Sequence, residues 1–76
     1  MKNDLLKWED VAGSSHVQSR AYDRKNKMLY VRFKNSDKTY RYVDVPESVV
    51  IAFRNAVSPG NFINTVLRDN YKVEKV

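Results

Sequence analysis

Cysteine is absent from this chain of 76 residues, and glycine and proline each occur only twice. Without cysteine, the chain has no disulfide framework, no thiolate nucleophile and no thiolate metal site. Two glycines do not make a glycine-rich phosphate loop, and one histidine with scattered carboxylates makes no metal-ligand cluster. No set of positioned acid, base and nucleophile stands out either. We therefore expect a protein that is not an enzyme and needs no cofactor.

Long apolar runs are lacking as well. The N-terminal stretch MKNDLLKWED contains no apolar segment of signal-peptide length. No other part of the chain approaches the roughly 18 apolar residues of a membrane span. The absence of cysteine also suits a reducing compartment. We expect a cytoplasmic protein that has no contact with a membrane.

The chain is short and basic. Its length corresponds to one domain, and a core of this size typically contributes only about 3 to 5 kcal/mol of net stability. Such a core leaves little room for a deep pocket, so a ligand site is expected on the surface or between subunits. Fourteen Lys and Arg against nine Asp and Glu give a formal net charge of +5. This charge favours anionic partners, although solubility alone also explains it.

Three segments of alternating hydrophobicity predict an antiparallel sheet, at residues 15–24, 27–34 and 38–46. Turn-forming residues separate them at 23–26 and 35–37. The second segment is the firmest strand, with an apolar set facing the core and a polar set facing outward: Leu29, Val31 and Phe33 against Tyr30, Arg32 and Lys34. Consecutive strands with short turns make a β-meander, in which we expect three to four strands.

The first strand and the segment before it are less regular. Simple alternation puts Val17, Ser19 and Ala21 on one side of this strand, and His16, Gln18, Arg20 and Tyr22 on the other. Residues 1–13 form an N-terminal arm, and residues 14–76 form the single domain. The apolar residues of the arm fit either a helical turn or an edge strand: Leu5, Leu6, Trp8 and Val11. Trp8 is most simply interpreted as a plug of the core.

The hydrophobic period changes after residue 45 and predicts two helices. Pro46 and Glu47 suit a first helical turn, because this turn needs no N–H from proline and favours a negative charge. An apolar stripe follows, formed by Val49, Ala52, Phe53 and Ala56. After the break SPGN at 58–61, a second helix buries Phe62, Ile63, Val66 and Leu67. Two amphipathic helices can cover one face of the sheet, so the expected fold class is α+β.

Short motifs along the chain resemble a known family. In order they are S14-S15, Y22-D23, L29-x-V31-x-F33, Y40-x-Y42, V45-P46, A56-x-S58-x-G60-x-F62, N64 and L67-R68-x-x-Y71. Together they are similar to the KTSC domain, which is named for the C-terminal extension of some lysyl-tRNA synthetases and also occurs as small free-standing bacterial and phage proteins. The resemblance covers roughly residues 11–71, with Ala21 and Pro59 as modest departures. It implies a free-standing domain with a role in binding RNA.

The stretch KTYRYVDVP, from residue 38, leaves two registers open. Tyr40 and Tyr42 point to one side of the strand and Arg41 to the other. If the tyrosines share the face of Leu29, they belong to the core and their hydroxyls reach its edge. The other face then carries a basic patch around one aromatic ring, made of Arg20, Arg32, Lys34, Arg41 and Tyr30. If the tyrosines face outward instead, the sheet becomes a platform for stacking RNA bases.

Residues near the second helix add candidates for anion binding. Ser58 and Asn61 lie at its N-terminus, where free backbone N–H groups attract anions, although a simple turn between helices explains them as well. Arg68, on the last helical turn, fits either a cover of the sheet edge or a ligand site. Ser15 and His16, as neighbours on a strand, are expected to point to opposite faces and so to be badly placed for proton transfer.

These observations favour a non-catalytic binder of phosphate-bearing nucleotide ligands, most directly a small RNA-binding or nucleic-acid-binding module. The alternative is a homo-oligomeric, phage-type sponge that sequesters a nucleotide or cyclic nucleotide immune signal between subunits. An adaptor for an acidic protein also stays open. Arg41 is the leading candidate for contact with an anion. The full set of candidate ligand residues is Arg41, Arg32, Arg20, Lys34, Tyr30, Tyr40, Tyr42, Ser58, Asn61 and Arg68.

Overall fold

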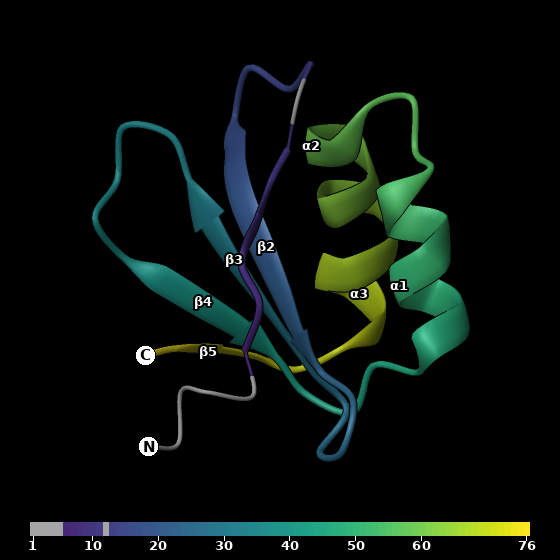
Figure 1. Ribbon diagram of the computed structural model, residues 1–76. Helices are drawn as coiled ribbons and strands as arrows, with labels where there is room; N and C mark the ends of the chain where they lie inside the picture. Colours follow the sequence, from purple (N-terminus) through teal and green to yellow (C-terminus); the bar gives the residue numbers. More distant parts are fainter. Residues whose placement is uncertain (1–5, 12) are drawn as a thin grey trace.

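The computed structural model describes residues 6–11 and 13–76 as one sheet covered by helices on one face (Figure 1). The five antiparallel strands follow the order of the chain: β1 (Glu9–Asp10), β2 (Val17–Asp23), β3 (Met28–Phe33), β4 (Thr39–Tyr42) and β5 (Val73–Lys75). The helical layer consists of α1 (Glu47–Arg54) and a second segment made of α2 (Pro59–Phe62), the π-helical turn η2 (Ile63–Leu67) and α3 (Arg68–Asn70). The expected α+β class is confirmed.

Two short edge strands extend the expected meander. β2, β3 and β4 are the three strands that the sequence predicts. β1 adds two residues of the arm beside β2, and β5 adds three residues beside β4. The sheet therefore has five strands instead of the expected three to four, because segments of two or three residues are too short to show alternation.

The core lies between the sheet and the helices. The register pairs Leu29 with Tyr42 and Val31 with Tyr40 across β3 and β4, so both tyrosines share the apolar face. Tyr42 is buried at 5% exposure, and Tyr40 is half-buried against the core. Of the two registers that the sequence left open, the structure has the one with the tyrosines inside. The buried apolar cluster is Val11, Val17, Leu29, Val31, Tyr42, Val45, Val50, Phe53, Ile63 and Leu67.

A β-bulge in β2 overturns the predicted faces of that strand. Val17 pairs with Phe33, but Ser19 pairs with Arg32, so the alternation slips by one residue between Val17 and Ser19. After the slip, Arg20 lies opposite Val31 on the helix face. The prediction that Arg20 shares the open face with the other cations is therefore wrong. A one-residue insertion moves every later side chain to the other face of a strand.

The apolar stripe of α1 is also displaced from its predicted position. Phe53 is buried as expected, but Val50 is buried beside it and Ala52 is exposed. α1 begins at Glu47, with Pro46 as its N-cap residue. Val50 is the better choice for the core because its larger side chain removes more apolar surface from water than the methyl group of Ala52.

The N-terminal arm lies along the edge of β2 as a strand. Val11 is buried in the core, and its backbone N–H donates to the Gln18 carbonyl at 2.9 Å. Trp8 lies on the open face of the sheet, where its ring centroid is 6.4 Å from that of Tyr30. The prediction that Trp8 plugs the core is therefore wrong. Leu5, the first apolar residue predicted for the arm, lies outside the described residues.

Candidate functional site

The predicted ligand residues fall into separate places in the structure. The open face of the sheet carries Tyr30, Arg32 and Arg41, as expected. The helix face and the adjoining end of the helical layer carry Tyr40, Tyr42, Ser58, Asn61 and Arg68. Arg20 lies between β2 and α1, and Lys34 follows the end of β3. No single ligand-sized surface unites all ten residues.

The open face holds its two arginines in contacts within the chain. The Arg41 Nε donates to the Glu74 carboxylate on β5 at 2.9 Å. The Tyr30 phenol raises the pKa of the Arg41 guanidinium, and Glu74 raises it further; in turn Arg41 lowers the pKa of Glu74. The Arg32 guanidinium carbon lies 4.1 Å from the centroid of the Trp8 ring. Because both cations have internal partners, this face is a weaker anion site than the sequence predicts.

A polar cavity of about 520 Å³ opens at the end of the helical layer, between the loop before β2 and the start of α2. The loop turns at Gly13, whose φ of 79° lies in the left-handed region that favours glycine. The polar lining residues are Ser14, Ser15, His16, Ser58, Asn61, Asn64 and Arg68. Serine hydroxyls, amides and one guanidinium therefore converge on one hollow, which suits an anionic ligand.

A second, more aromatic cavity adjoins the first. It measures about 440 Å³ and shares Phe33, Tyr42 and Arg68 with the polar cavity. Phe33 and Tyr40 meet here edge to face, with ring centroids 5.6 Å apart. We call the two cavities together the Arg68 groove, because Arg68 lines both. One wall of this groove is aromatic and the other is polar.

Arg68 itself is exposed on the last turn of the helical segment. Among residues 6–11 and 13–76, its guanidinium has no carboxylate within salt-bridge distance. Burial raises the pKa of the Tyr42 phenol beneath it and Tyr40 adds to this, whereas the positive charge of Arg68 opposes the rise. Tyr42 is therefore a neutral phenol at physiological pH, and Arg68 supplies the positive charge of the groove.

Several of the residues that carry the sequence resemblance line this groove. Ser14 and Ser15 come from one side of the polar cavity, and the helical segment brings the others from the opposite side: Ser58, Gly60, Asn64 and Arg68. Of the residues lining this groove, the sequence analysis predicted Tyr40, Tyr42, Ser58, Asn61 and Arg68 as ligand residues, but not Ser14, Ser15, His16 or Asn64. The motif pattern already contained Asn64 and both serines, and it was the signal that could have found them.

The loop before β2 is fixed by polar contacts. The Ser14 hydroxyl accepts from the Val17 backbone N–H at 2.9 Å, and the Lys34 ammonium donates to the Ser14 carbonyl at 2.7 Å. Lys34 therefore supports the rim of the groove. Ser15 Oγ and His16 Nδ1 are 3.0 Å apart, because both residues lie in a bend before the strand begins. The expectation that their side chains point to opposite faces is wrong.

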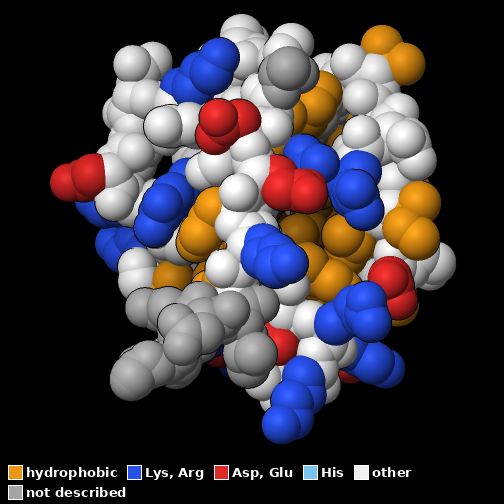
Figure 2. Space-filling model, in the orientation of Figure 1, with side chains coloured by type: hydrophobic (Ala, Val, Ile, Leu, Met, Phe, Trp, Pro, Cys, Tyr) orange, Lys and Arg blue, Asp and Glu red, His pale blue; other side chains and the backbone are white. Residues whose placement is uncertain are grey.

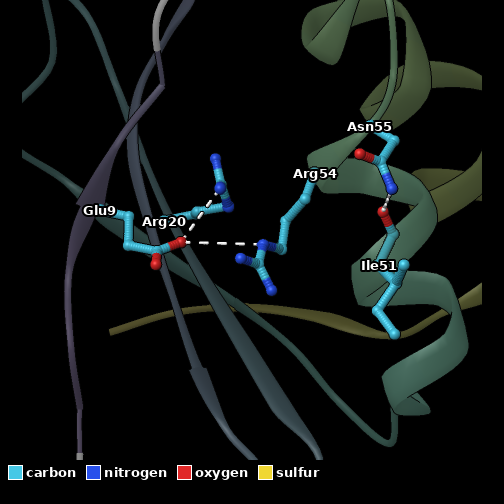
Figure 3. Close-up of polar contacts among 5 residues, drawn as sticks. All are labelled: Glu9, Arg20, Ile51, Arg54 and Asn55. Carbon is cyan, nitrogen blue, oxygen red and sulfur yellow. Dashed lines mark hydrogen bonds and ion pairs between the residues drawn. The ribbon is translucent and has the colours of Figure 1, made fainter.

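Arg20 belongs to neither the open face nor the groove. It lies in a cleft between β2 and α1, where its Nη2 donates to Glu9 Oε1 at 3.0 Å (Figure 3). Within the part of the chain that the structure describes, no three His, Asp or Glu side chains are grouped to hold a metal ion. No helix of the described residues is long and apolar enough to span a membrane.

The comparisons with known proteins identify the family. A family model for the KTSC domain matches residues 13–71. The chain belongs to the KTSC family. It is similar to the crystal structure of a KTSC domain protein from Yersinia pestis, with 34% sequence identity and a TM-score of 0.85 over 93% of this chain and 97% of that one. A search of curated proteins found no match. The structural match spans nearly all of both chains.

Proposed function

We propose that this KTSC protein is a non-catalytic binder of phosphate-bearing nucleotide ligands, and that single-stranded RNA is its principal ligand. The observation that carries the proposal is the position of Arg68 between an aromatic wall and a polar wall. A nucleotide presents the same two chemistries side by side, since each base has an apolar face and each phosphate carries negative charge. We also propose that the protein acts in the cytoplasm, whether it binds RNA or a small nucleotide.

The aromatic wall suits the bases. Phe33 and Tyr40 are half-buried, so each packs in part on the core and in part lines the cavity. Stacking of a base on such a ring contributes about 1 to 3 kcal/mol and tolerates any sequence, because every base has a π-face. The wall therefore supports binding to single strands, in which bases are free to turn outward.

The polar wall suits the backbone. The Arg68 guanidinium offers a planar fork to phosphate oxygens, and Asn61 and Asn64 offer amide donors beside it. The exposed hydroxyls of Ser15 and Ser58 can hydrogen-bond to the 2′-hydroxyl that distinguishes RNA from DNA. The net charge of +5 adds long-range attraction for a polyanion. These features favour RNA over an acidic protein.

Fluorescence anisotropy with labelled single-stranded RNA and DNA of equal length tests the proposal. We expect Arg68→Gln to weaken RNA binding about tenfold, as for the loss of a hydrogen-bonded charge. The slope of log K against log salt should fall by about 0.7, because one phosphate contact is lost. Lys25→Gln, in the exposed turn after β2, removes the same charge and should leave binding unchanged. Equal affinity of the two variants would overturn the assignment of the groove.

A second candidate function rests on the size of the groove. Its cavities, of about 520 and 440 Å³, lie in the range typical of small-molecule sites. A homo-oligomer that sequesters a nucleotide or cyclic nucleotide immune signal would use the same residues. Thermal melting with mononucleotides, cyclic dinucleotides and RNA separates the two functions. A large shift with one small nucleotide supports the sponge, and a shift that grows with RNA length and fades with salt supports the RNA-binding module.

A further inference from the structure

A second basic hollow lies between the arm, β2 and α1. A cavity of about 180 Å³ is lined by four cations and one carboxylate: Lys7, Arg20, Arg24 and Arg54, with Glu9. An adjoining space of about 490 Å³ shares Arg20 and Arg54 with it. In Figure 2, Lys and Arg side chains gather around a hollow with an apolar floor at this seam between sheet and helix. We call it the Arg20–Arg54 cleft; it shares no lining residue with the Arg68 groove.

Two arginines in the cleft converge on one oxygen. Arg20 Nη2 is 3.0 Å from Glu9 Oε1, and Arg54 Nε is 3.9 Å from the same oxygen (Figure 3). The Arg20 side chain is only 15% exposed, because the bulge in β2 turns it beneath the helix. A buried guanidinium needs an anion at its donors. Glu9 supplies a single negative charge against two facing positive ones, so the cleft stays electropositive.

The two arginines and the carboxylate differ in how firmly the fold holds them. Arg20 lies in the middle of the seven-residue strand β2, and Arg54 ends a helix that is anchored by Val50 and Phe53. Glu9 lies on the two-residue edge strand β1, and its side chain is 52% exposed. The negative charge therefore lies on the shortest of the three elements, and the exposed Glu9 side chain can turn toward solvent while the Arg20 side chain, which is 15% exposed, keeps its position.

We propose that the Arg20–Arg54 cleft is a binding site for a dianionic phosphate group, and that the Glu9 carboxylate occupies this site in the free protein. A phosphodiester carries one negative charge and would gain little over the carboxylate already present. A terminal phosphate carries about −1.5 to −2 charges and three acceptor oxygens, enough to engage both guanidinium groups. It can also enter a cleft end-on, whereas a continuous backbone needs an exit. This site is independent of the proposed function of the Arg68 groove.

Titration with inorganic phosphate at constant ionic strength, followed by NMR of the arginine Nε–Hε groups, tests the site. We expect the signals of Arg20 and Arg54 to shift with phosphate but not with chloride or the monoanionic diester dimethyl phosphate. Glu9→Gln should strengthen phosphate binding about tenfold, because it removes the competing charge and keeps the shape of the side chain. Arg54→Gln should weaken binding about tenfold. The exposed Lys38→Gln is the charge-matched control and should bind as the unaltered protein does.

Two results would overturn the site. In the first, Arg54→Gln binds phosphate as tightly as Lys38→Gln does, so the charge acts from elsewhere. In the second, Glu9→Gln does not strengthen binding, so the Glu9 contact is only structural. Loss of RNA binding in Arg68→Gln leaves these signals unaffected, so the two proposals fail separately. Titration with RNA that carries or lacks a 5′-phosphate identifies the source of the phosphate group. If the Arg20 and Arg54 signals shift only with the phosphorylated strand, the ligand is an RNA end. If inorganic phosphate shifts these signals and neither strand does, the ligand is a small phosphorylated molecule.

Discussion

Arg41 on β4 and Glu74 on β5 face each other across the last two strands of the sheet and form an ion pair. The Arg41 Nε donates to the Glu74 carboxylate at 2.9 Å, and a second guanidinium nitrogen reaches the same oxygen. β5 has only three residues, and Val73 at its start is 44% exposed. With so little apolar burial, the attachment of β5 depends on its backbone pairing and on this ion pair.

Reversal of one charge in this pair should loosen β5. Arg41→Glu places two carboxylates opposite each other, and like charges at directly opposite positions destabilise a sheet. We expect a melting temperature a few degrees lower and faster hydrogen exchange in β5. The swap Arg41→Glu with Glu74→Arg should recover most of the loss, as a double-mutant cycle measures. A double variant that shows the sum of the two single losses would mean that the pair is not coupled.

The same pair predicts a loss of stability in acid. Arg41 lowers the pKa of Glu74 in the folded protein below its ordinary value of 4.5. The contribution of Glu74 to stability is therefore complete above the unfolded pKa and is lost as pH falls through the lower, folded pKa. Asp23 behaves in the same way, because the Asn26 side chain lowers its pKa. Urea unfolding of the unaltered protein and of Glu74→Gln isolates the contribution of the Glu74 carboxylate to the free energy of unfolding. Between pH 5 and pH 3, the Glu74→Gln variant should lose less stability than the unaltered protein.

Much of the fold could be predicted from the sequence because its central strands and helices follow regular periods. Leu29 and Val31 mark the buried face of β3 by simple alternation, and Phe53 marks that of α1. The errors lie where a period breaks. The bulge after Val17 moved Arg20 to the helix face, and no residue type in that strand signals an inserted position.

The candidate site was harder to predict because it joins distant parts of the chain. The loop at Ser14 and the helical segment at Ser58 are brought together only by the packing of α2 beside the start of β2. Local pattern cannot show such a contact, and only the order of the family motifs pointed to it. The sequence placed Arg41 on the open face correctly but could not show its ion pair with Glu74, because Glu74 lies in a strand too short to recognise.

Tyr42 should be essential for folding. It is 5% exposed in the main core cluster and pairs with Leu29 across the sheet. Removal of a large core side chain costs about 3 to 5 kcal/mol, which equals the whole stability expected for a domain of this size. We expect Tyr42→Ala to be largely unfolded at room temperature by circular dichroism. Tyr42→Phe keeps the ring and should stay folded; similar unfolding of both variants would show that the hydroxyl is the important group.

Trp8 should report whether the arm is attached to the open face. It is the only tryptophan in the chain, and its ring lies beneath the Arg32 guanidinium and beside Tyr30. An exposed cation–π contact contributes about 0.5 to 1 kcal/mol. Arg32→Ala should therefore lower the melting temperature by about 2 to 8 °C for a domain of this size.

The same Arg32→Ala variant should shift the tryptophan emission to longer wavelength and increase quenching by acrylamide, while the far-ultraviolet circular dichroism stays unchanged. Lys38→Ala, in the loop before β4, removes a cation without touching the arm and should leave the emission as it is. Unchanged emission in Arg32→Ala would mean that other contacts hold Trp8 on the sheet.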